Sequence, residues 1–454
     1  MIHAYTQNGL NIILDVESGA IHILEELPYK MLKYINPPME EKCSEEIKIK
    51  MLTHGFTEEM SVLAYDELYS LYKDEMLFTE RDYVIELKND YPVKALCLHI
   101  AHDCNMRCKY CFAEGGDFAQ GRKLMPFEVA KKAIDFIIEK SEKRVNLEVD
   151  FFGGEPLLGF DVVKKTVEYA RSIEKEHNKI FRFTITTNGI LLNDENTDYI
   201  NSEMSNVVLS LDGRKSVNDN TRIRIGGSGS YDTIVPKFKK FVKKRGSQSY
   251  YIRGTFTADN LDFSEDVMHI KDLGFEQVSV EPVVLDESSP YALKEENLPR
   301  IYNEYEKLAL KIDEINEKGE FFNFFHFMID LEQGPCVIKR VKGCGSGSEY
   351  VAVSPDGDIY PCHRFVGKPD FLMGNVLEGF ELNPQIKQKF TASNVLNKPE
   401  CEQCWAKYFC SGGCAANNFN ANGDILKPNK ISCELERKRI ECAIMIKGLQ
   451  ATRE

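Results

Sequence analysis

The sequence lacks several features that would place it in common protein classes. Its 57 basic residues are outnumbered by 71 acidic residues, which gives a formal net charge of -14. A nucleic-acid-binding protein needs a basic face that displaces the counterions of phosphate groups, so we expect no nucleic-acid partner. No run of about 18 uncharged apolar residues occurs, and we therefore expect no membrane-spanning helix and no membrane partner.

Targeting and low-complexity segments are also absent. The stretch Met1–Leu10 contains no basic segment followed by an apolar run, so we expect no signal peptide and a cytoplasmic location. In that reducing compartment, the 14 cysteines are expected to be metal ligands or catalytic thiols rather than disulfides. The hydrophobic fraction of 43% is enough for real cores, and 454 residues predict two or three domains.

Residues 1–85 predict a small domain that mixes strands and helices. Two short apolar runs, Ile12–Asp15 and Ala20–Leu24, surround a turn at Gly19 and predict a β-hairpin. Ser44 and Thr57 are expected to cap helices. The helical patterns that follow the hairpin are Pro28–Ile35, Glu45–His54 and Ser61–Met76. Residues 86–94, with mixed charge, are expected to be a linker.

Residues 95–320 alternate between strand-like and helix-like segments, which predicts βα units and a parallel sheet or barrel. The fold class is therefore expected to be α/β, with an incomplete, six-stranded (β/α)6 version of the eight-stranded TIM barrel. The expected strands are Ala95–Ile100, Leu147–Phe152, Phe181–Thr186, Asn206–Leu211, Tyr251–Phe256 and Gln277–Val280. The expected helices between them include Pro126–Lys140, Val162–His177 and Ser264–Leu273.

Residues 321–454 are rich in turns and in cysteine. This zone is predicted to be a small domain that is organised by metal rather than by a large apolar core. Its nine cysteines are Cys336, Cys344, Cys362, Cys401, Cys404, Cys410, Cys414, Cys433 and Cys442.

Three further cysteines, Cys104, Cys108 and Cys111, directly follow the first predicted strand. In a barrel, the loops that follow the strands form the active-site face. Three thiolates leave one iron of a [4Fe-4S] cluster free for a non-protein ligand, whereas four thiolates would close the cluster. The alternative is a structural zinc site that is completed by His99 or His102.

This motif, with Tyr110 before its third cysteine, resembles the radical S-adenosylmethionine (SAM) superfamily. Further family elements follow in order at successive strand ends: Gly153-Gly154-Glu155-Pro156, Thr186–Gly189, Ser210–Gly213 and Val280–Pro282. In that family the free iron chelates the amino and carboxylate groups of SAM. The resemblance implies cofactor contacts from Gly153, Gly154, Glu155, Thr186, Asn188, Ser210, Asp212 and Arg222. Glu155 would contribute to binding the amino group and Arg222 would pair with the carboxylate, while Phe152 stands where the family often has a polar residue.

The later cysteines resemble the seven-cysteine SPASM signature of peptide-modifying radical SAM enzymes. Their spacing is Cys344-x12-Gly357-x4-Cys362, then Cys401-x2-Cys404-x5-Cys410-x3-Cys414, then Cys433. The resemblance implies two auxiliary clusters and thus three [4Fe-4S] clusters in all. Cys401, Cys404, Cys410 and Cys433 would ligate the distal auxiliary cluster, and Cys344, Cys362 and Cys414 the proximal one. Cys336 could be the fourth ligand of the proximal cluster. Otherwise that cluster could have an open iron for a substrate thiolate, or Cys336 could simply be a buried apolar residue.

The N-terminal zone resembles the winged-helix-like peptide recognition element of ribosomal-peptide maturases. An exposed edge strand near Ala20–Leu24 could accept the leader of a precursor peptide as an added strand. The alternative is a generic oligomerisation or stability module.

All three zones together resemble thioether-forming maturases of six-cysteine (SCIFF) peptides, and next the sactipeptide synthases. The implied reaction begins when a flavodoxin-type or ferredoxin-type donor reduces the first cluster, which cleaves SAM to methionine and a 5′-deoxyadenosyl radical. This radical removes hydrogen from an acceptor residue, often Thr, and a substrate Cys sulfur bonds to that carbon. An auxiliary cluster takes the second electron and can acidify the thiol.

Two rival functions remain open at this point. Anaerobic sulfatase maturases oxidise Cys or Ser to formylglycine and carry an Asp base at the position of His363. Here His363 and Arg364 are the candidate catalytic residues, although His363 could equally be structural. A non-catalytic, metal-stabilised peptide-binding scaffold is the rival from another class, but it would leave the SAM elements without a purpose.

Overall fold

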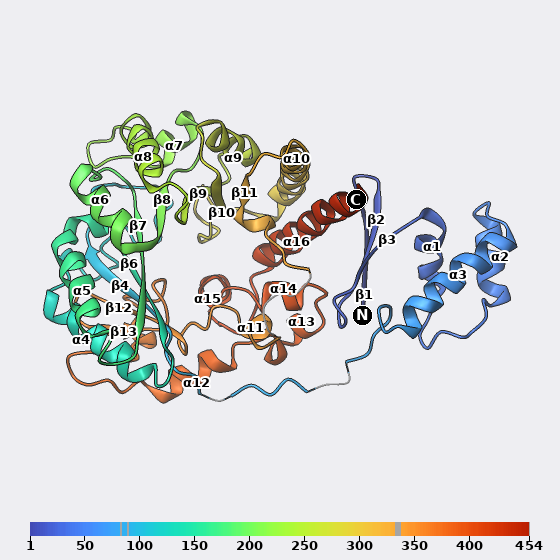
Figure 1. Cartoon of the computed structure of the whole chain (residues 1–454), viewed down its shortest axis with the longest axis horizontal. Coiled ribbons are helices and arrows are strands. Elements are labelled where there is room, and N and C mark those ends of the chain that lie inside the picture. The colour runs from blue at the N-terminus through green and yellow to red at the C-terminus, as the bar shows by residue number, and fades with distance from the viewer. Residues whose placement is uncertain (82–83, 89, 332–336, 454) are drawn as a thin grey trace.

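The computed structural model describes residues 1–81, 84–88, 90–331 and 337–453. It confirms the α/β class with a partial barrel, a small N-terminal β domain and a cysteine-rich C-terminal region (Figure 1). Six parallel strands lie side by side in chain order. They are β4 (Ala95–His102), β6 (Asn146–Gly153), β7 (Ile180–Thr187), β8 (Met204–Ser210), β9 (Tyr250–Phe256) and β10 (Gln277–Pro282).

This sheet continues beyond the six strands at both ends. Two short parallel strands, β11 (Asn323–Phe324) and β12 (Tyr350–Val353), pair with β10 and β4 respectively. The predicted boundary at residue 320 therefore falls within one hydrogen-bonded sheet, and the domain limits stay a prediction. Antiparallel additions to the sheet are β5 (Lys123–Leu124), β13 (Asp358–Tyr360) and β14 (Gly374–Asn375).

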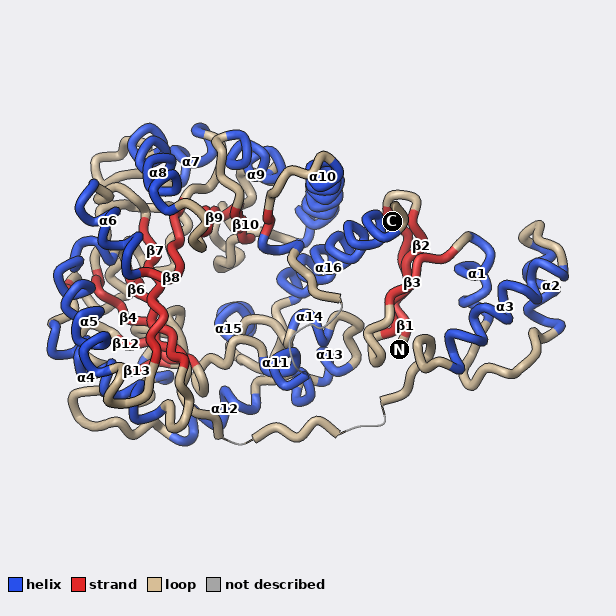
Figure 2. The backbone as a smooth tube through the Cα atoms, viewed as in Figure 1, coloured by secondary structure: helices blue, strands red, loops and turns tan. Residues whose placement is uncertain are grey.

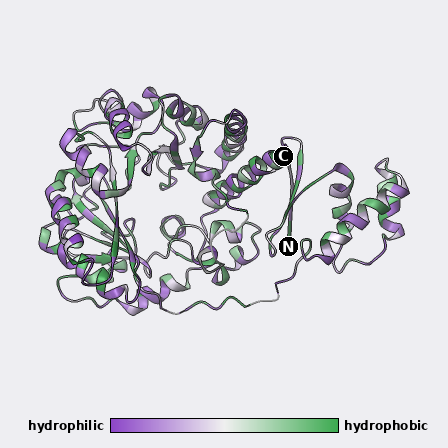
Figure 3. Cartoon of the chain, viewed as in Figure 1, coloured by the Kyte–Doolittle hydropathy of each residue, from purple (hydrophilic) through white to green (hydrophobic). Residues whose placement is uncertain are grey.

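The helices between the strands form the outer layer of the barrel (Figure 2). Most of them carry both hydrophilic and hydrophobic residues (Figure 3). In α4 (Phe127–Lys140), Val129, Ala133 and Ile137 are buried at a spacing of four residues, which is one apolar stripe of a helix. The other barrel helices are α5 (Phe160–Ile173), α6 (Asp194–Glu203), α7 (Lys215–Thr221), α8 (Tyr231–Arg245), α9 (Phe263–Asp272) and α10 (Leu298–Glu317).

The N-terminal domain contains a three-stranded antiparallel sheet in the order β1 (Ile2–Gln7), β2 (Leu10–Asp15) and β3 (Ile21–Leu24). The sequence predicted β2 and β3 but missed β1, whose residues show no clear apolar alternation. Ser44 and Thr57 cap the second and third helices through the backbone N–H groups of Ile47 and Met60, as predicted. The helices are α1 (Glu26–Met31), α2 (Glu45–Thr53) and α3 (Glu58–Lys73).

Strand β2 joins this domain to the rest of the molecule because its side chains alternate between two cores. Ile13 packs in the core of the N-terminal helices, whereas Ile12 and Leu14 belong to the main core. The main core includes the long helix α16 (Lys430–Ala451), whose C-terminal end lies beside the N-terminal sheet (Figure 1).

Short helices and loops make up the remaining C-terminal region. They carry the cysteines, and they also enclose an apolar cluster that includes Phe365, Phe371 and Phe390, so the prediction of a region without a substantial apolar core was wrong. Among the described residues, no helix is long and apolar enough to cross a membrane. The helices are α11 (Val337–Lys342), α12 (Pro384–Ala392), α13 (Pro399–Glu402), α14 (Lys407–Cys410) and α15 (Ala415–Asn422).

Candidate active site

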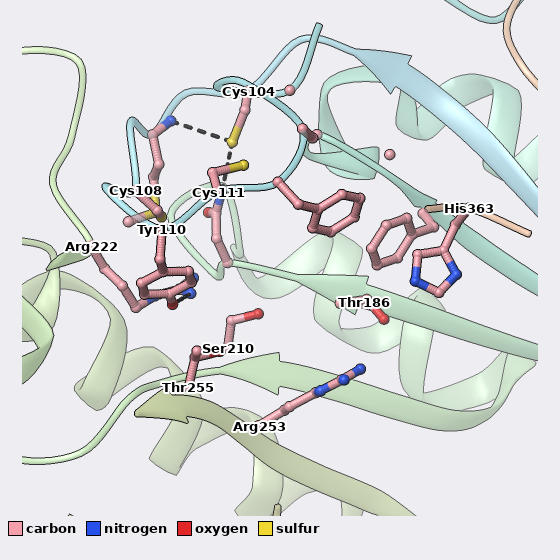
Figure 4. Close-up of a pocket in the computed structure, with 18 of the residues that line it drawn as sticks. Cys104, Cys108, Tyr110, Cys111, Thr186, Ser210, Arg222, Arg253, Thr255 and His363 are labelled. Atoms are coloured by element: carbon pink, nitrogen blue, oxygen red, sulfur yellow. Dashed lines mark hydrogen bonds between the residues drawn. The ribbon is translucent and has the colours of Figure 1, made fainter. Parts of the chain in front are cut away.

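A cavity of about 270 Å³ lies at the carboxyl ends of the six parallel strands. Its walls contain all three cysteines of the first motif, as Figure 4 shows. Eight of the other predicted site residues also line it: Gly153, Gly154, Thr186, Asn188, Ser210, Arg222, His363 and Arg364. Parallel strands end at one edge of a sheet, so distant motifs meet here.

Tyr110 organises one wall of the cavity. Its hydroxyl donates to the carboxylate of Asp212 at 2.8 and 2.9 Å and accepts from Nη1 of Arg222 at 2.9 Å. Asp212 is fully buried and is not part of the cavity lining. This placement differs from the predicted cofactor contact, because the carboxylate holds Tyr110 and Thr221 instead of facing the cavity.

Glu155 also lies behind the lining rather than in it. Its carboxylate accepts hydrogen bonds from the hydroxyl of Thr187 at 2.8 Å and from the backbone N–H groups of Asn188 and Leu157. Burial raises the pKa of Glu155 to about 7, and these donors oppose the shift. Glu155, which was predicted to help bind the amino group of SAM, thus holds the end of β7 and the backbone of Asn188 in place.

Glycines let the backbone of the cysteine loop and the end of β6 approach each other closely. A Cβ atom at Gly154 would lie 2.2 Å from the carbonyl oxygen of Asp103, and one at Gly153 would lie 2.4 Å from that of Ala101. These distances are too short for a real Cβ atom, so any other residue at these two positions would push the backbone apart. The two glycines therefore let this strand end approach the cysteine loop through the backbone, while their contact with a cofactor stays a prediction.

The chemistry of these residues fits an iron–sulfur cluster and a bound carboxylate. Burial raises the pKa of Cys104 to about 12 and of Cys108 to about 11, so thiolates here need a positive partner such as iron. Within the described part of the chain, the buried Nε of Arg222 has no hydrogen-bond partner. An anion beside Arg222 would satisfy this donor.

His99 and His102 do not take part in this cysteine site. Nδ1 of His99 lies 3.1 Å from Nε2 of His102, and both rings are fully buried beside Phe118. Neither ring lines the cavity. The arrangement gives no support to the zinc alternative, in which one of them would complete the three-cysteine motif.

His363 lines the cavity among aromatic rings. Its Nδ1 lies 3.1 Å from the hydroxyl of Tyr350, and its ring centroid lies 5.0 Å from that of Phe152. Burial, together with Arg364 and Arg253, lowers the pKa of His363 to about 3. The imidazole is therefore neutral at physiological pH, and it is a poor general base.

A charged network that the sequence analysis missed closes the far wall. Glu281 lines the cavity, and its carboxylate lies 3.7 Å from Arg253 and 3.4 Å from Nε2 of His326. Nδ1 of His326 lies 2.8 Å from a guanidinium nitrogen of Arg439, which can only donate, so Nε2 carries the imidazole proton. Burial by itself would raise the pKa of Glu281. His326, Arg253 and Arg439 outweigh this effect, so the pKa of Glu281 is lowered overall. The sequence signal that could have indicated this network is the charged residue Glu281 at the end of a predicted strand.

The four cysteines predicted for the distal auxiliary cluster lie in the walls of a second cavity. This cavity has a volume of about 500 Å³. Cys401, Cys404 and Cys410 come from α13, α14 and their connection, whereas Cys433 comes from the first turns of α16. Tertiary structure thus brings together cysteines that are separated by 32 positions of sequence, and the cavity provides room for a cluster.

The proximal set is more open. Cys362 is buried, with its pKa raised to about 12 by burial and then by Cys414 and Cys344, both of which are exposed. Cys362 immediately precedes His363 and Arg364, so this set adjoins the cavity of the first motif. Cys336, the candidate fourth ligand, lies outside the described residues.

These features define an α/β protein whose cysteines gather at cavities that fit iron–sulfur clusters. Comparison with known families agrees: residues 98–288 match the radical SAM superfamily, and residues 344–405 match the iron–sulfur cluster-binding SPASM domain. The chain thus contains a radical SAM domain followed by a SPASM domain, and the two domains imply SAM and [4Fe-4S] clusters.

Its relatives are distant. The chain is 22% identical to the radical SAM cyclopropyl synthase TigE of Paramaledivibacter caminithermalis, over 94% of this chain and 91% of TigE. It is 25% identical to a cysteine-type anaerobic sulfatase-maturating enzyme of Clostridium novyi, over 69% of this chain and 86% of that enzyme. The structure of Streptococcus suis SuiB bound to the precursor peptide SuiA has a TM-score of 0.51 at 17% identity and covers 95% of this chain and 98% of SuiB. This structural likeness extends the shared fold to the N-terminal domain.

Proposed function

We propose that this enzyme forms an intramolecular thioether crosslink in a small, cysteine-rich, ribosomally made peptide. A cysteine sulfur of the peptide would be joined to a carbon of another residue, which the resemblance to SCIFF maturases indicates to be Thr. The observation that carries the proposal is the adjacency of two sites: Cys362 of the proximal set directly precedes two residues that line the cavity of the first motif.

The chain's own residues would divide the work around the bound peptide. Cys104, Cys108 and Cys111 would hold the first cluster, and Arg222 would pair with the SAM carboxylate. When bound, SAM and the clusters supply the radical that removes hydrogen and an acceptor for the second electron. Glu281 would accept the thiol proton at a carboxylate oxygen, because it is the ionised carboxylate of the cavity wall.

The N-terminal domain would bind the leader of the precursor. Strand β3 is half-exposed throughout and, among the described residues, is paired on one side only. An extended peptide can add to such an edge through backbone hydrogen bonds. The SuiB complex supports a precursor peptide as the class of partner, and a flavodoxin-type or ferredoxin-type protein would supply the electrons.

Formylglycine formation is the second candidate, favoured by the match to the Clostridium novyi enzyme over 86% of that enzyme's length. Against it, the position of the family's Asp base is occupied by His363, whose pKa is lowered to about 3. Carbon–carbon ring closure, suggested by the name of TigE, is a third possible reaction. One experiment distinguishes all three reactions.

The test is mass spectrometry of the peptide encoded beside the gene, after anaerobic incubation with reconstituted enzyme, SAM and reductant. A thioether gives loss of two hydrogens and one cysteine that no longer reacts with iodoacetamide. Formylglycine formation replaces the cysteine sulfur by oxygen and also removes two hydrogens, and carbon–carbon closure loses two hydrogens while every thiol still reacts. Either of the last two products would overturn the thioether proposal.

A further inference from the structure

Lys398 is a cation that the fold buries without a carboxylate. Its side chain is among the largest fully buried ones, with 1% of its surface exposed. Nζ donates to the backbone carbonyl of Gly412 at 2.8 Å, and no described carboxylate lies within ion-pair distance of it. Burying an ammonium group without nearby negative charge is strongly unfavourable. The site therefore points to negative charge that another group supplies.

Lys398 contacts cysteine-bearing segments of both auxiliary sites. Burial lowers the pKa of Lys398, and Cys401, Cys410 and Cys433 of the distal set, together with Cys414 of the proximal set, oppose this shift. Its backbone carbonyl accepts from the N–H of Cys401 at 2.9 Å, while its ammonium reaches Gly412, which lies between Cys410 and Cys414. The side chain thus extends from one cysteine segment to the turn that connects the two sites.

We propose that Lys398 is the shared counter-charge of the two auxiliary clusters and raises their reduction potentials. The inference rests on the iron–sulfur sites of the proposed function. Reduction adds one negative charge to a cluster, and a fixed cation in a water-poor environment stabilises that charge. Loss of the cation would make each auxiliary cluster harder to reduce, and so a poorer acceptor for the electron released in thioether formation.

A purely structural role is the competing explanation, because Lys398 also fixes a strained turn. Ser411, Gly412 and Gly413 have φ values of 60°, 84° and 73°, which lie in the left-handed region. Lys398→Gln separates the two roles, because its amide keeps a hydrogen-bond donor but carries no charge. Lys398→Arg keeps the charge.

The experiment is a potentiometric titration followed by electron paramagnetic resonance. It uses the full chain with Cys104, Cys108 and Cys111 changed to Ala, so that the remaining iron belongs to the auxiliary sites. Lys430→Gln is the matched control, since Lys430 lines the same distal cavity but is 71% exposed and pairs with Glu295.

At the midpoint potential of the parent, we expect Lys398→Gln to lower the ratio of reduced to oxidised cluster about tenfold. This corresponds to about 59 mV for one electron. Lys398→Arg should stay near the parent, and Lys430→Gln should change the ratio by less than about twofold because water screens it. An unchanged ratio in Lys398→Gln, with full iron content, would overturn the inference.

Two further outcomes are decisive. If Lys398→Gln loses auxiliary iron while Lys398→Arg retains it, the positive charge is required and the counter-charge role is supported. If both variants lose the iron, Lys398 is a packing residue and the inference is wrong. Absence of auxiliary iron in the parent would instead contradict the proposed function.

Discussion

Single residues decide how closely the chain's backbone approaches itself around the first cysteine motif. Gly116 and Gly154 face each other across the loop: a Cβ atom on Gly154 would lie 3.0 Å from the Cα of Gly116. At this distance the loop has no space for a methyl group. The position of Cys104, directly after Asp103, consequently depends on the absence of a side chain at Gly154.

We therefore expect Gly154→Ala to displace the Cys104 loop. Iron bound by the first motif should fall by more than half, and reductive SAM cleavage should fall about a hundredfold, since a displacement of about 1 Å can have this effect. Gly226→Ala is the control, because a Cβ atom there meets nothing within 4 Å. Iron analysis and 5′-deoxyadenosine release measure both effects. Equal behaviour of the two variants would contradict the close-packing argument.

His363 gives a prediction about pH. Because burial lowers its pKa to about 3, the imidazole stays neutral throughout the range from pH 6 to 8. His363→Gln should accordingly leave the shape of the pH profile unchanged over that range, with a loss of rate below about tenfold. The measurement is initial rate of peptide modification against pH. Disappearance of a titration step in the variant would identify His363 as a base after all.

At the scale of elements, α16 links three parts of the protein. Its first turns carry Cys433, its middle carries Arg439 of the Glu281 network, and its last turns pack against the N-terminal sheet. The start of this helix is fixed by Asn429, whose side chain accepts from the N–H of Ser432 at 2.7 Å. Movement of this end would displace Cys433.

We expect Asn429→Ala to cost about 1 kcal/mol of unfolding free energy, as removal of an N-cap usually does. It should also reduce the iron held by the distal set. Asn383→Ala, which removes the equivalent cap of α12, should have a similar cost without affecting iron. Urea unfolding and iron content are measured on both variants. Normal iron content in Asn429→Ala would show that the cap does not position Cys433.

At the scale of the whole molecule, the N-terminal domain contacts the distal cysteine site directly. Glu17, in the turn after β2, forms an ion pair with Lys407, and their side chains are only 9% and 4% exposed. Tyr408 donates to the same carboxylate at 2.9 Å, and His3 stacks on Trp405. Lys407 also lines the distal cavity. The turn after β2 therefore packs directly against the wall of the distal cavity.

Removing Glu17 should leave Lys407 buried and unpaired. We expect Glu17→Ala to cost about 3 kcal/mol in the unfolding of this interface. Burial raises the pKa of Glu17, but Lys407 and Tyr408 lower it below its usual 4.5, so the stabilisation is present above that pH and is lost as the pH falls. Thermal unfolding at pH 7 and pH 4 measures both effects.

The control is Glu26→Ala, which breaks an exposed pair with Lys30 within α1. It should change the unfolding temperature little. A difference between wild type and Glu17→Ala that is as large at pH 4 as at pH 7 would contradict the role of this ion pair.

The sequence predicted those features that depend on local pattern. Alternating apolar runs located all six barrel strands within a few residues, and cap residues such as Ser44 and Thr57 began helices where expected. Strand β1 was missed because its pairing with β2, and not its own pattern, makes it a strand. Asp212 and Glu155 were recognised by their motifs, but a motif does not reveal whether a carboxylate faces the cavity or the layer behind it.

What the sequence determined by itself was the order of cysteines, glycines and strands, since spacing and hydrophobic period are properties of the chain. Only the tertiary structure decided which groups share an environment. It placed Glu281 with His326 and Arg439, buried Lys398 between two sets of cysteines, and joined Glu17 to Lys407. These partners are far apart along the chain, and burial, which sets their charge and pKa, exists only once the chain is folded.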